Sequence, residues 1–391
     1  MNTTAIASTR YAQPAAPAEV DALLLWPALV LLLFGLVMVY SASIAIAEAG
    51  KSTGYQPTYY LVRHGIYLAI GLVLGVVAFQ VPLRFWQGWA PWAFLVGVVL
   101  LALVLVPHIG HEKNGAQRWI SLRVISFQPS EIMKLLVVLY AADYTTRKLD
   151  AMASFRRGFL PMAIMMLLVG YLLLHEPDFG AFVVIASIAF GILFLGGINV
   201  RLFVMLAIVA AIGSAILIWI QPYRLDRVVG FIDPWQDAHG KGYQLTNALT
   251  AIGHGEWFGV GLGSGVGKLF YLPEPHTDFL LAVVAEELGV FGVIAVIALF
   301  ALLIQRAFAV GRQALLLDRV FNGLVALGIG TWLGVQSFIN MGVNIGLLPT
   351  KGLTLPLMSY GGTGIVVNCL ALAILMRVDY ENRRLMRGQS A

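Results

Sequence analysis

The sequence predicts an all-α polytopic membrane protein, with about ten transmembrane helices and a long irregular external loop between helices 7 and 8. Of its 391 residues, 59% are hydrophobic and only 12% are charged. Soluble domains hold about 45–50% apolar and about 25% charged residues, so this composition is typical of a chain surrounded by lipid. Ten apolar runs follow one another along the chain, and a span needs about 20 residues. We therefore expect one membrane domain.

The apolar runs set the expected helices. In chain order they cover residues 23–46, 61–81, 90–106, 132–144, 159–174, 179–198, 202–220, 279–304, 321–345 and 353–376. The fourth run is short and spans only if flanking residues such as Glu131 join it. The sixth and seventh runs are so close that they must form an antiparallel hairpin. Residues 1–22 are polar and the first run is long, so we expect a true span and no cleavable signal peptide.

The basic residues predict the orientation, because short cytoplasmic loops are enriched in Lys and Arg. Such residues follow the fourth, sixth, eighth and tenth runs: Arg147, Lys148, Arg156, Arg157, Arg201, Arg306, Arg312, Arg319, Arg377, Arg383, Arg384 and Arg387. All of these lie on one side of an even-numbered scheme. We therefore expect cytoplasmic tails at 1–22 and 379–391, a membrane domain at 23–378, and a large periplasmic loop at 221–278. A Gly-rich loop of this length commonly carries function.

The net charge and the cysteine content argue against a nucleic-acid-binding protein and against a disulfide-bonded protein. The net charge of +5 does not indicate nucleic acid binding, because membrane proteins collect Lys and Arg in their cytoplasmic loops. We expect no nucleic acid partner. The single cysteine, Cys369, lies inside an apolar run, so an intrachain disulfide is excluded and a packing role is expected.

Cations also occur on the expected outer side, against the usual bias. They are Arg63, Lys113, Arg118, Arg123, Arg224, Arg227, Lys241, Lys268 and Lys351, with Lys134 inside the fourth run. Charge kept at a membrane boundary is costly and tends to be functional, and clustered cations suit an anionic ligand such as a pyrophosphate. Ordinary solvation with snorkelling is the alternative. We favour function for Arg118, Lys134 and Lys351, which lie beside apolar runs.

Two sets of carboxylates admit a structural and a functional interpretation. Glu131 and Lys134 are three residues apart and share a helix face, so they form either a neutralising pair or part of a substrate site. Glu286 and Glu287 lie inside the eighth run, where structural pairing is favoured over chemistry.

The turn before the sixth run holds His175, Glu176 and Asp178. One His and two carboxylates on a tight turn are a weak indication of a metal site. The favoured alternative is that Asp178 caps the helix that begins at Phe179.

Asp278 opens the eighth run, directly after the sequence PEPHT at 273–277. One interpretation is a helix cap, since Asp is favoured there and the helix dipole stabilises an anion. The other is a general base at the boundary between water and lipid. Periodicity alone does not decide between them.

Several long motifs resemble those of one known family. They are QRWI at 117–120, QPSEIMK at 128–134, EPDFG at 176–180, FYLPE at 270–274, HTDF at 276–279, AEELG at 285–289, LPTKGLTLP at 348–356 and SYGG at 359–362. Together they resemble the SEDS family (shape, elongation, division and sporulation) over the whole chain after about residue 20. PTKG at 349–352 and RVDYEN at 377–382 resemble the cell-division members more than the elongation members. Gly265 stands where many members have Ser.

The resemblance implies a peptidoglycan glycosyltransferase that polymerises lipid II at the outer face of the cytoplasmic membrane during septal wall synthesis. Such a reaction needs a base for the acceptor hydroxyl and positive charge for the departing pyrophosphate. Asp278 is the expected base. The expected substrate-binding residues are Arg118, Glu131, Lys134, Lys268, His276, Thr277, Lys351 and Ser359. No metal ligands are assigned, and the resemblance leaves a divalent cation, Mg or Mn, open as a cofactor.

The resemblance also implies partners: undecaprenyl pyrophosphate, a class B penicillin-binding protein (FtsI-like) that crosslinks the new strand, other divisome membrane proteins, and membrane lipid. Two alternatives to the polymerase remain. A lipid II flippase should have polar groups in both leaflets, often at broken helices near the midplane, whereas the conspicuous charges here gather on the expected outer side. A non-catalytic divisome scaffold leaves the buried charges unexplained.

Overall fold

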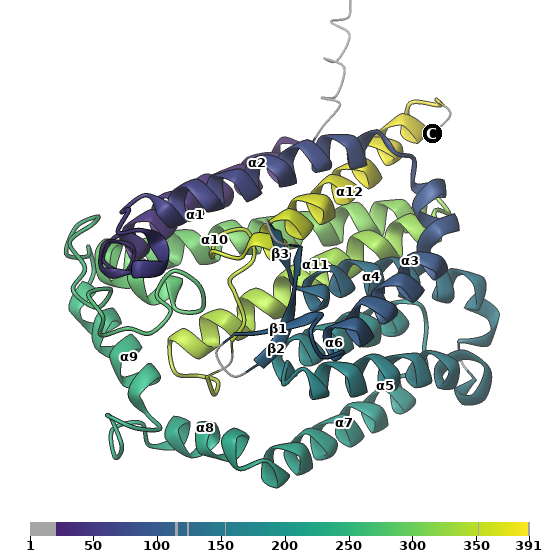
Figure 1. The fold of residues 1–391 in the computed structure, drawn as a ribbon. Coiled ribbons are helices and arrows are strands. Elements are labelled where there is room, and N and C mark those ends of the chain that lie inside the picture. The colour runs from purple at the N-terminus through teal and green to yellow at the C-terminus, as the bar shows by residue number, and fades with distance from the viewer. Residues whose placement is uncertain (1–20, 114–115, 123–124, 153, 351, 390–391) are drawn as a thin grey trace, which may run out of the picture.

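The computed structural model describes residues 21–113, 116–122, 125–152, 154–350 and 352–389, and its elements are shown in Figure 1. Ten long helices form the bundle: α1 (Ala22–Ala49), α2 (Tyr59–Gln80), α3 (Leu83–Val104), α4 (Pro129–Arg147), α5 (Leu160–His175), α6 (Phe179–Leu195), α7 (Val200–Ile220), α10 (Leu280–Leu316), α11 (Val320–Asn344) and α12 (Gly362–Met386). Each of the ten predicted runs contributes one of them, which confirms the predicted fold class.

Seven helical segments of the described residues are long and apolar enough to cross a membrane. They are α1, α2, α3, the segment Phe155–His175 that contains α5, α10, α11 and α12, while α6 is a shorter apolar helix. Large apolar side chains on the outer helices are exposed, among them Val73 of α2 and Leu167 of α5, at 64% and 70%. Such a surface suits lipid tails rather than water.

Two connections contain structure that the sequence did not lead us to expect. The segment 221–278, expected to be irregular, holds α8 (Pro222–Ile232) and α9 (Tyr243–Gly255). The connection between α3 and α4 forms an antiparallel sheet of β1 (Gly110–Lys113), β2 (Ala116–Leu122) and β3 (Ile125–Phe127), in the order β1-β2-β3. In its register Gly110 pairs with Ile120, and Ile120 also pairs with Phe127.

The tenth run also differs from its prediction. Residues 353–361 are not helical, and α12 begins only at Gly362 and continues to Met386, so most of the expected C-terminal tail is helical. Pro356 contributes to this difference, because proline has no backbone N–H and disfavours helix in the residue before it.

Local capping explains where several helices begin. Asp21 accepts a hydrogen bond from Leu23 N at 2.9 Å at the start of α1. Asp178 accepts one from Ala181 N at 3.2 Å at the start of α6, which confirms the capping role predicted for it.

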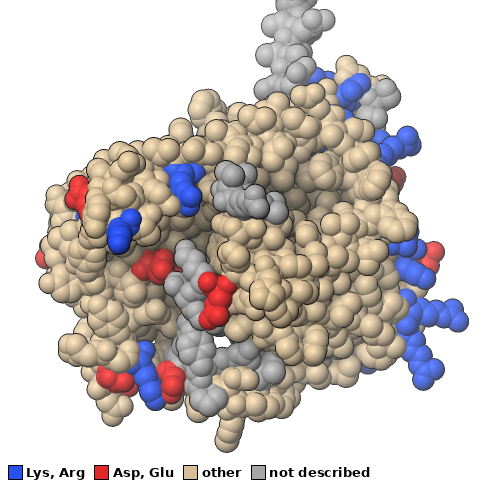
Figure 2. All heavy atoms as spheres, in the orientation of Figure 1, with Lys and Arg blue, Asp and Glu red and all other residues tan. Residues whose placement is uncertain are grey.

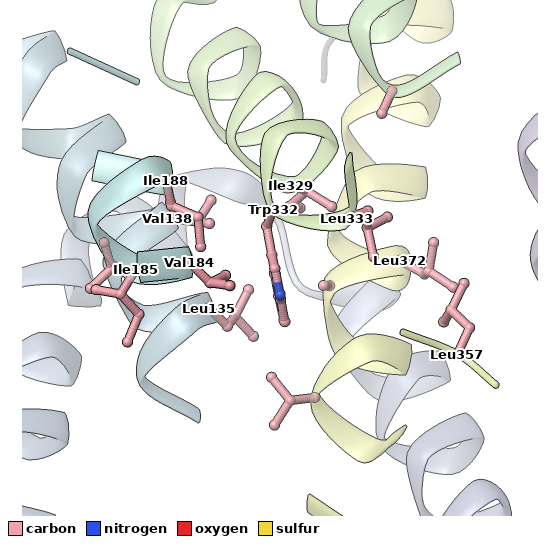
Figure 3. Close-up of a cluster of buried hydrophobic side chains, with 14 of the residues drawn as sticks. Leu135, Val138, Val184, Ile185, Ile188, Ile329, Trp332, Leu333, Leu357 and Leu372 are labelled. Carbon is pink, nitrogen blue, oxygen red and sulfur yellow. The ribbon is translucent and has the colours of Figure 1, made fainter. Parts of the chain in front are cut away.

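The core lies where α4, α6, α11 and α12 pack together. Its centre is Trp332 of α11, which is fully buried. Figure 3 shows Leu135 and Val138 beside it, with Val184, Ile185 and Ile188 on the neighbouring helix. Figure 1 shows α11 in the interior of the bundle, and most of the side chains of this helix are buried.

Both ends of the described chain lie at the same end of the bundle. Asp21 forms ion pairs with Arg306 of α10 and with Arg383 of α12, the latter at 3.3 Å. Arg306 lies 26 residues along α10 from Leu280, so the two residues are far apart along the bundle. We call this the terminal end, and the opposite end, where α10 begins, the Asp278 end.

Candidate functional site

Asp278 lies just before α10, in a partly exposed segment at the Asp278 end. The N-cap residue of α10 is Phe279, so the capping role considered for Asp278 is not what the structure shows. Asn344 of α11 supplies the cap instead, since its Oδ1 accepts a hydrogen bond from Ala282 N at 3.0 Å. The Asp278 carboxylate lies close to the backbone of Gly352, where an added Cβ would be 3.4 Å from Asp278 Oδ2.

Thr277 and His276, the residues before Asp278, are held in different ways. Thr277 is partly exposed and its hydroxyl donates to the carbonyl and the carboxylate of Glu274, both at 3.2 Å. His276 is buried, and its ring packs against Tyr60 and Tyr360, with centroids 4.5 and 5.5 Å away. Tyr360 N donates to the carbonyl of His276 at 2.9 Å. Burial raises the pKa of Tyr360 to about 12, so its phenol is neutral at physiological pH.

Arg118, on β2, holds the turn between α5 and α6. Its Nε donates to the carbonyl of Glu176 at 3.1 Å, and its Nη2 donates to the carbonyl of Pro177. Arg118 as a whole is half-buried. Asp178 joins the same turn to α4, because its Oδ2 accepts from Ser130 Oγ at 2.9 Å.

Glu131 and Lys134 form a buried pair inside the bundle. Lys134 Nζ lies 2.7 Å from Glu131 Oε1 and 2.8 Å from Gln336 Oε1, and the Lys134 side chain is fully buried. Gln336 also accepts from Trp332 Nε1 at 2.7 Å and donates to the carbonyl of Thr354 at 2.9 Å. The structure therefore places Lys134 in an internal polar network and not on a surface.

Lys268 is also engaged within the protein. Its Nζ donates to Ser41 Oγ, to the carbonyl of Gly263 and to Glu287 Oε1 at 2.9, 2.7 and 2.6 Å, and the side chain is 5% exposed. These three contacts use all three N–H groups of an ammonium. The pairing predicted for Glu287 is thereby confirmed.

Glu286 holds the glycine-rich loop that precedes Lys268. Its Oε1 accepts from Val266 N at 2.8 Å and from Gly267 N at 3.0 Å. A Cβ added at Gly265 would lie 2.8 Å from Glu286 Oε2. Glycine at 265, the departure from the family pattern, therefore gives this carboxylate room to approach the loop.

Apart from Ser359 and Lys351, the predicted site residues fall into four groups. Thr277, Asp278 and the backbone of Gly352 lie together at the Asp278 end, with His276 beneath. Arg118 lies with the 175–178 turn, Glu131 with Lys134, and Lys268 with Glu287. Ser359 is buried, and its Oγ accepts from Leu355 N at 3.0 Å, which closes a turn in the 353–361 segment. Lys351 lies outside the described residues.

Sequence reasoning missed Asn340 and Asn344, whose side chains both contact the carbonyl of Asp278. They lie four residues apart inside the ninth run, and polar residues at that spacing within an apolar run are a signal that could have revealed them.

Two features of the described residues bear on ligands. No group of three or more His, Cys, Asp and Glu side chains in this part of the chain could hold a metal ion. An open cavity of about 460 Å³ lies between α3 and α4, lined by Arg84, Gln87, Gly88, Pro91, Asp143 and Arg147. None of its lining residues belongs to the site around Asp278.

Known proteins resemble the chain over nearly its whole length. A family model described as a cell cycle protein, and covering FtsW, RodA and SpoVE, matches residues 21–384. A relative from Aromatoleum aromaticum, named probable peptidoglycan glycosyltransferase FtsW, is 69% identical over 373 residues, which are 95% of this chain and 91% of the relative. A relative of the same name from Burkholderia thailandensis is 57% identical over 95% of this chain and 80% of its own.

Solved structures share the fold. A chain of a peptidoglycan synthase complex, reported for the structural coordination of polymerization and crosslinking, superposes with a TM-score of 0.75 at 29% identity, over 93% of this chain and 98% of that chain. The rod shape determining protein RodA of Thermus thermophilus gives a TM-score of 0.68 at 28% identity, over 93% and 97%. The higher identity with the FtsW relatives agrees with the division-type motifs in the sequence.

Proposed function

Because the chain belongs to the family of cell cycle proteins that comprises FtsW, RodA and SpoVE, we propose that it is a peptidoglycan glycosyltransferase that polymerises lipid II into glycan strands. The names of its relatives support this activity. The observation that carries the site assignment is the placement of Asp278: a partly exposed carboxylate at one end of the bundle, in a helix start whose cap is supplied by another residue.

In the proposed reaction Asp278 is the general base. Its carboxylate accepts the proton of the acceptor sugar hydroxyl as that oxygen bonds to the anomeric carbon of the donor. The bond from this carbon to the pyrophosphate oxygen breaks, and undecaprenyl pyrophosphate departs. A single displacement converts the α-linked donor into a β-linked chain, so one catalytic carboxylate suffices.

The departing pyrophosphate needs positive charge. We assign this role to Arg118, a half-buried residue whose guanidinium contacts the 175–178 turn, and to Lys351, which precedes Gly352 in sequence. The proposal gives Lys134 and Lys268 a different part, because both ammonium groups are occupied by buried protein partners. They would maintain the bundle around the site. Dependence on Mg²⁺ or Mn²⁺ is tested by removing divalent cations with EDTA and adding each back.

We place the Asp278 end on the outer face of the cytoplasmic membrane, with septal wall synthesis as the setting. Figure 2 shows Lys and Arg side chains crowded on the right edge of the molecule, the side where Figure 1 places the C-terminus. Exposed basic residues of the described chain near this end include Arg84, Arg147, Lys148, Arg156 and Arg157. An excess of Lys and Arg is typical of the cytoplasmic side, which supports this orientation.

The decisive experiment is polymerisation of lipid II by the purified Asp278→Asn variant. Asn keeps the size and shape of Asp but does not accept the proton, so the rate should fall by about 10²–10⁴-fold. Thermal stability and lipid II binding should stay at the wild-type level. A variant that polymerises at the wild-type rate would remove Asp278 as the base.

The same assay tests the anion contacts. Arg118→Ala and Lys351→Ala should each lose activity, because a hydrogen bond to a charged group contributes about 1.5–3 kcal/mol. Wild-type rates in both variants would mean that the pyrophosphate is held elsewhere.

A further inference from the structure

Two buried asparagines of α11 lie directly beneath Asp278. Asn340 and Asn344 are four residues apart, so they point from the same face of the helix, and they are 2% and 0% exposed. Neither carries charge, and neither belongs to the sequence motifs that resemble the family. Their hydrogen bonds nevertheless converge on the residue proposed as the base.

The amide of Asn340 joins two segments that are distant in sequence. Its Nδ2 donates to the carbonyl of Asp278 at 2.9 Å and to the carbonyl of Leu353 at 2.6 Å. An Asn amide has two N–H groups, so these two contacts use both of them. Leu353 directly follows Gly352, whose backbone the Asp278 carboxylate approaches. One amide therefore fixes the Asp278 segment and the adjoining 352–353 segment relative to each other.

The amide of Asn344 also makes several hydrogen bonds within the protein. Its Nδ2 donates to the carbonyl of Asp278 at 2.9 Å and to the carbonyl of Asn340 at 2.9 Å. Its Oδ1 accepts from Ala282 N, in the first turn of α10. Asn344 thereby ties the start of α10 and the preceding peptide to the same point on α11.

The Asp278 carbonyl thus accepts two hydrogen bonds from rigid, buried donors. The peptide unit is planar, so fixing the direction of this carbonyl fixes the rotation about the bond between the Asp278 Cα and its carbonyl carbon. The side chain of Asp278 starts from that same Cα. A carboxylate that must meet an acceptor hydroxyl in the correct geometry gains from such a fixed base, since a misplacement of about 1 Å can cost about 10²-fold in rate.

We propose that Asn340 and Asn344 are positioning residues for the glycosyl transfer, which hold the peptide of Asp278 and the 352–353 backbone in the arrangement that the reaction requires. The proposal rests on the proposed function, because it assigns these residues an effect exerted through Asp278. It differs from a purely structural role, which would lower stability without changing the turnover of the folded protein.

The test begins with Asn340→Ala and with Asn340→Asp, which keeps the shape of the side chain but removes both donors. In a lipid II polymerisation assay, kcat should fall about 10–100-fold while KM changes by about twofold or less. Asn322→Ala is the matched control. Asn322 is a buried asparagine of the same helix at the terminal end, and its Nδ2 donates to Glu381 Oε2 at 3.0 Å. This control should lose no more than about twofold in kcat.

A double variant separates positioning from a general weakening of the fold. If Asn340 acts through Asp278, Asn340→Ala should have almost no further effect on the residual rate of Asp278→Asn, because the base is already lost. If it acts independently, the two losses should multiply. Rates are compared at equal amounts of folded protein, as judged by size-exclusion profile and melting temperature.

Each outcome decides the matter. A kcat loss in Asn340→Ala that vanishes in the Asp278→Asn background supports the proposal. If Asn340→Ala has the wild-type kcat while Asp278→Asn is inactive, the positioning proposal is overturned and the assignment of Asp278 as the base stands. The positioning proposal is also overturned if the losses of the two single variants multiply in the double variant, or if Asn322→Ala loses as much kcat as Asn340→Ala. If Asp278→Asn itself polymerises normally, the proposed base and positioning through it fail together. If Asn340→Ala does not fold, Asn344→Ala and Asn340→Asp are judged by the same criteria.

Discussion

The carboxyl group of Glu176 is buried in the turn between α5 and α6, and neither of its oxygens has a hydrogen-bond partner among the described residues. Burial raises the pKa of Glu176 to about 9, with a smaller contribution from the nearby Asp178 carboxylate, and the Arg118 guanidinium opposes the shift. Glu176 is therefore protonated and neutral at physiological pH, which avoids the large cost of a buried unpaired charge.

This protonation predicts a dependence of stability on pH. The unfolded chain loses the Glu176 proton near its ordinary pKa of 4.5, whereas the folded chain keeps it up to about 9. Between these values the folded state binds the extra proton, so this group's contribution to stability is fully present below pH 4.5 and is lost as pH rises toward 9. Glu176→Gln, which is neutral at every pH, should have a shallower decline in melting temperature between pH 5 and 9. Equal slopes in the two proteins would show that Glu176 does not titrate in this range.

The residues proposed for the site differ in how far the sequence predicts their positions. The position of Asp278 just before a helix is predictable, because the eighth apolar run begins there. The roles of Lys134 and Lys268 are not, because a lysine beside an apolar run has the same sequence signature whether it meets a ligand or a buried carboxylate. The contacts of Asn340 cannot be predicted from the sequence for another reason. Its partners, Asp278 and Leu353, are brought to it only by the tertiary fold.

At the scale of the element, α10 is broken near its start. Gly289 has φ +65° and ψ −165°, a conformation open almost only to glycine. The break exposes backbone groups that bond to the loop before Lys268: Val260 N donates to the carbonyl of Glu286 and Gly261 N to that of Glu287, both at 3.0 Å. The eighth apolar run therefore forms two helical parts with a loop docked at their junction, and the first part carries Glu286 and Glu287.

Replacing Gly289 by Ala should destabilise this junction. The strained backbone alone costs roughly 1–3 kcal/mol, and the new Cβ would lie 2.4 Å from the carbonyl oxygen of Trp257. We expect a lower melting temperature and faster proteolysis of the 256–268 loop. Gly334→Ala, on α11, is the control, since its Cβ would meet Ile304 at an ordinary 3.6 Å. A Gly289→Ala protein as stable as the control would contradict the strained geometry.

The sequence predicts the ten long helices because each of them contains an apolar run, and the short fourth run reaches spanning length once flanking residues such as Glu131 join it. It does not predict the break at Gly289 or the non-helical 353–361 segment, because neither changes the apolar character of its run. The non-helical segment 353–361 is held by α11, because Gln336 donates to the carbonyl of Thr354 and Asn340 to that of Leu353. Hydrogen bonds from another helix are not visible in the local sequence, where Pro356 is the one residue that argues against a helix.

At the scale of the whole molecule, the two ends of the bundle differ in their charged residues and in the length of their connections. The terminal end joins α1, α10 and α12 through the Asp21 ion pairs and carries exposed basic residues (Figure 2). The long connections between helices, such as 221–278, lie at the Asp278 end. This layout predicts that a reporter fused after residue 240 is active on the outer side of the membrane, and that one fused at the C-terminus is active in the cytoplasm. The opposite pattern would reverse the proposed orientation and move Asp278 away from an outer substrate.

We expect this chain to act with a partner protein. A polymerase of this kind makes glycan strands, and nothing in the sequence resembles a transpeptidase that would crosslink them. The solved synthase complex, which has the same fold in one of its chains, is reported to coordinate polymerization with crosslinking. We therefore propose that this chain binds a class B penicillin-binding protein, and that the two act on one strand.

The tagged chain, purified from its own cells in mild detergent, should carry along a membrane protein that fluorescent penicillin labels. A tagged, unrelated polytopic protein expressed at the same level serves as the control for detergent carry-over. The labelled band should be absent from the control and should persist for Asp278→Asn, because a variant that keeps its fold keeps its binding surfaces. A chain that purifies without any penicillin-labelled protein, under conditions in which it still polymerises lipid II, would show that polymerisation does not depend on this association.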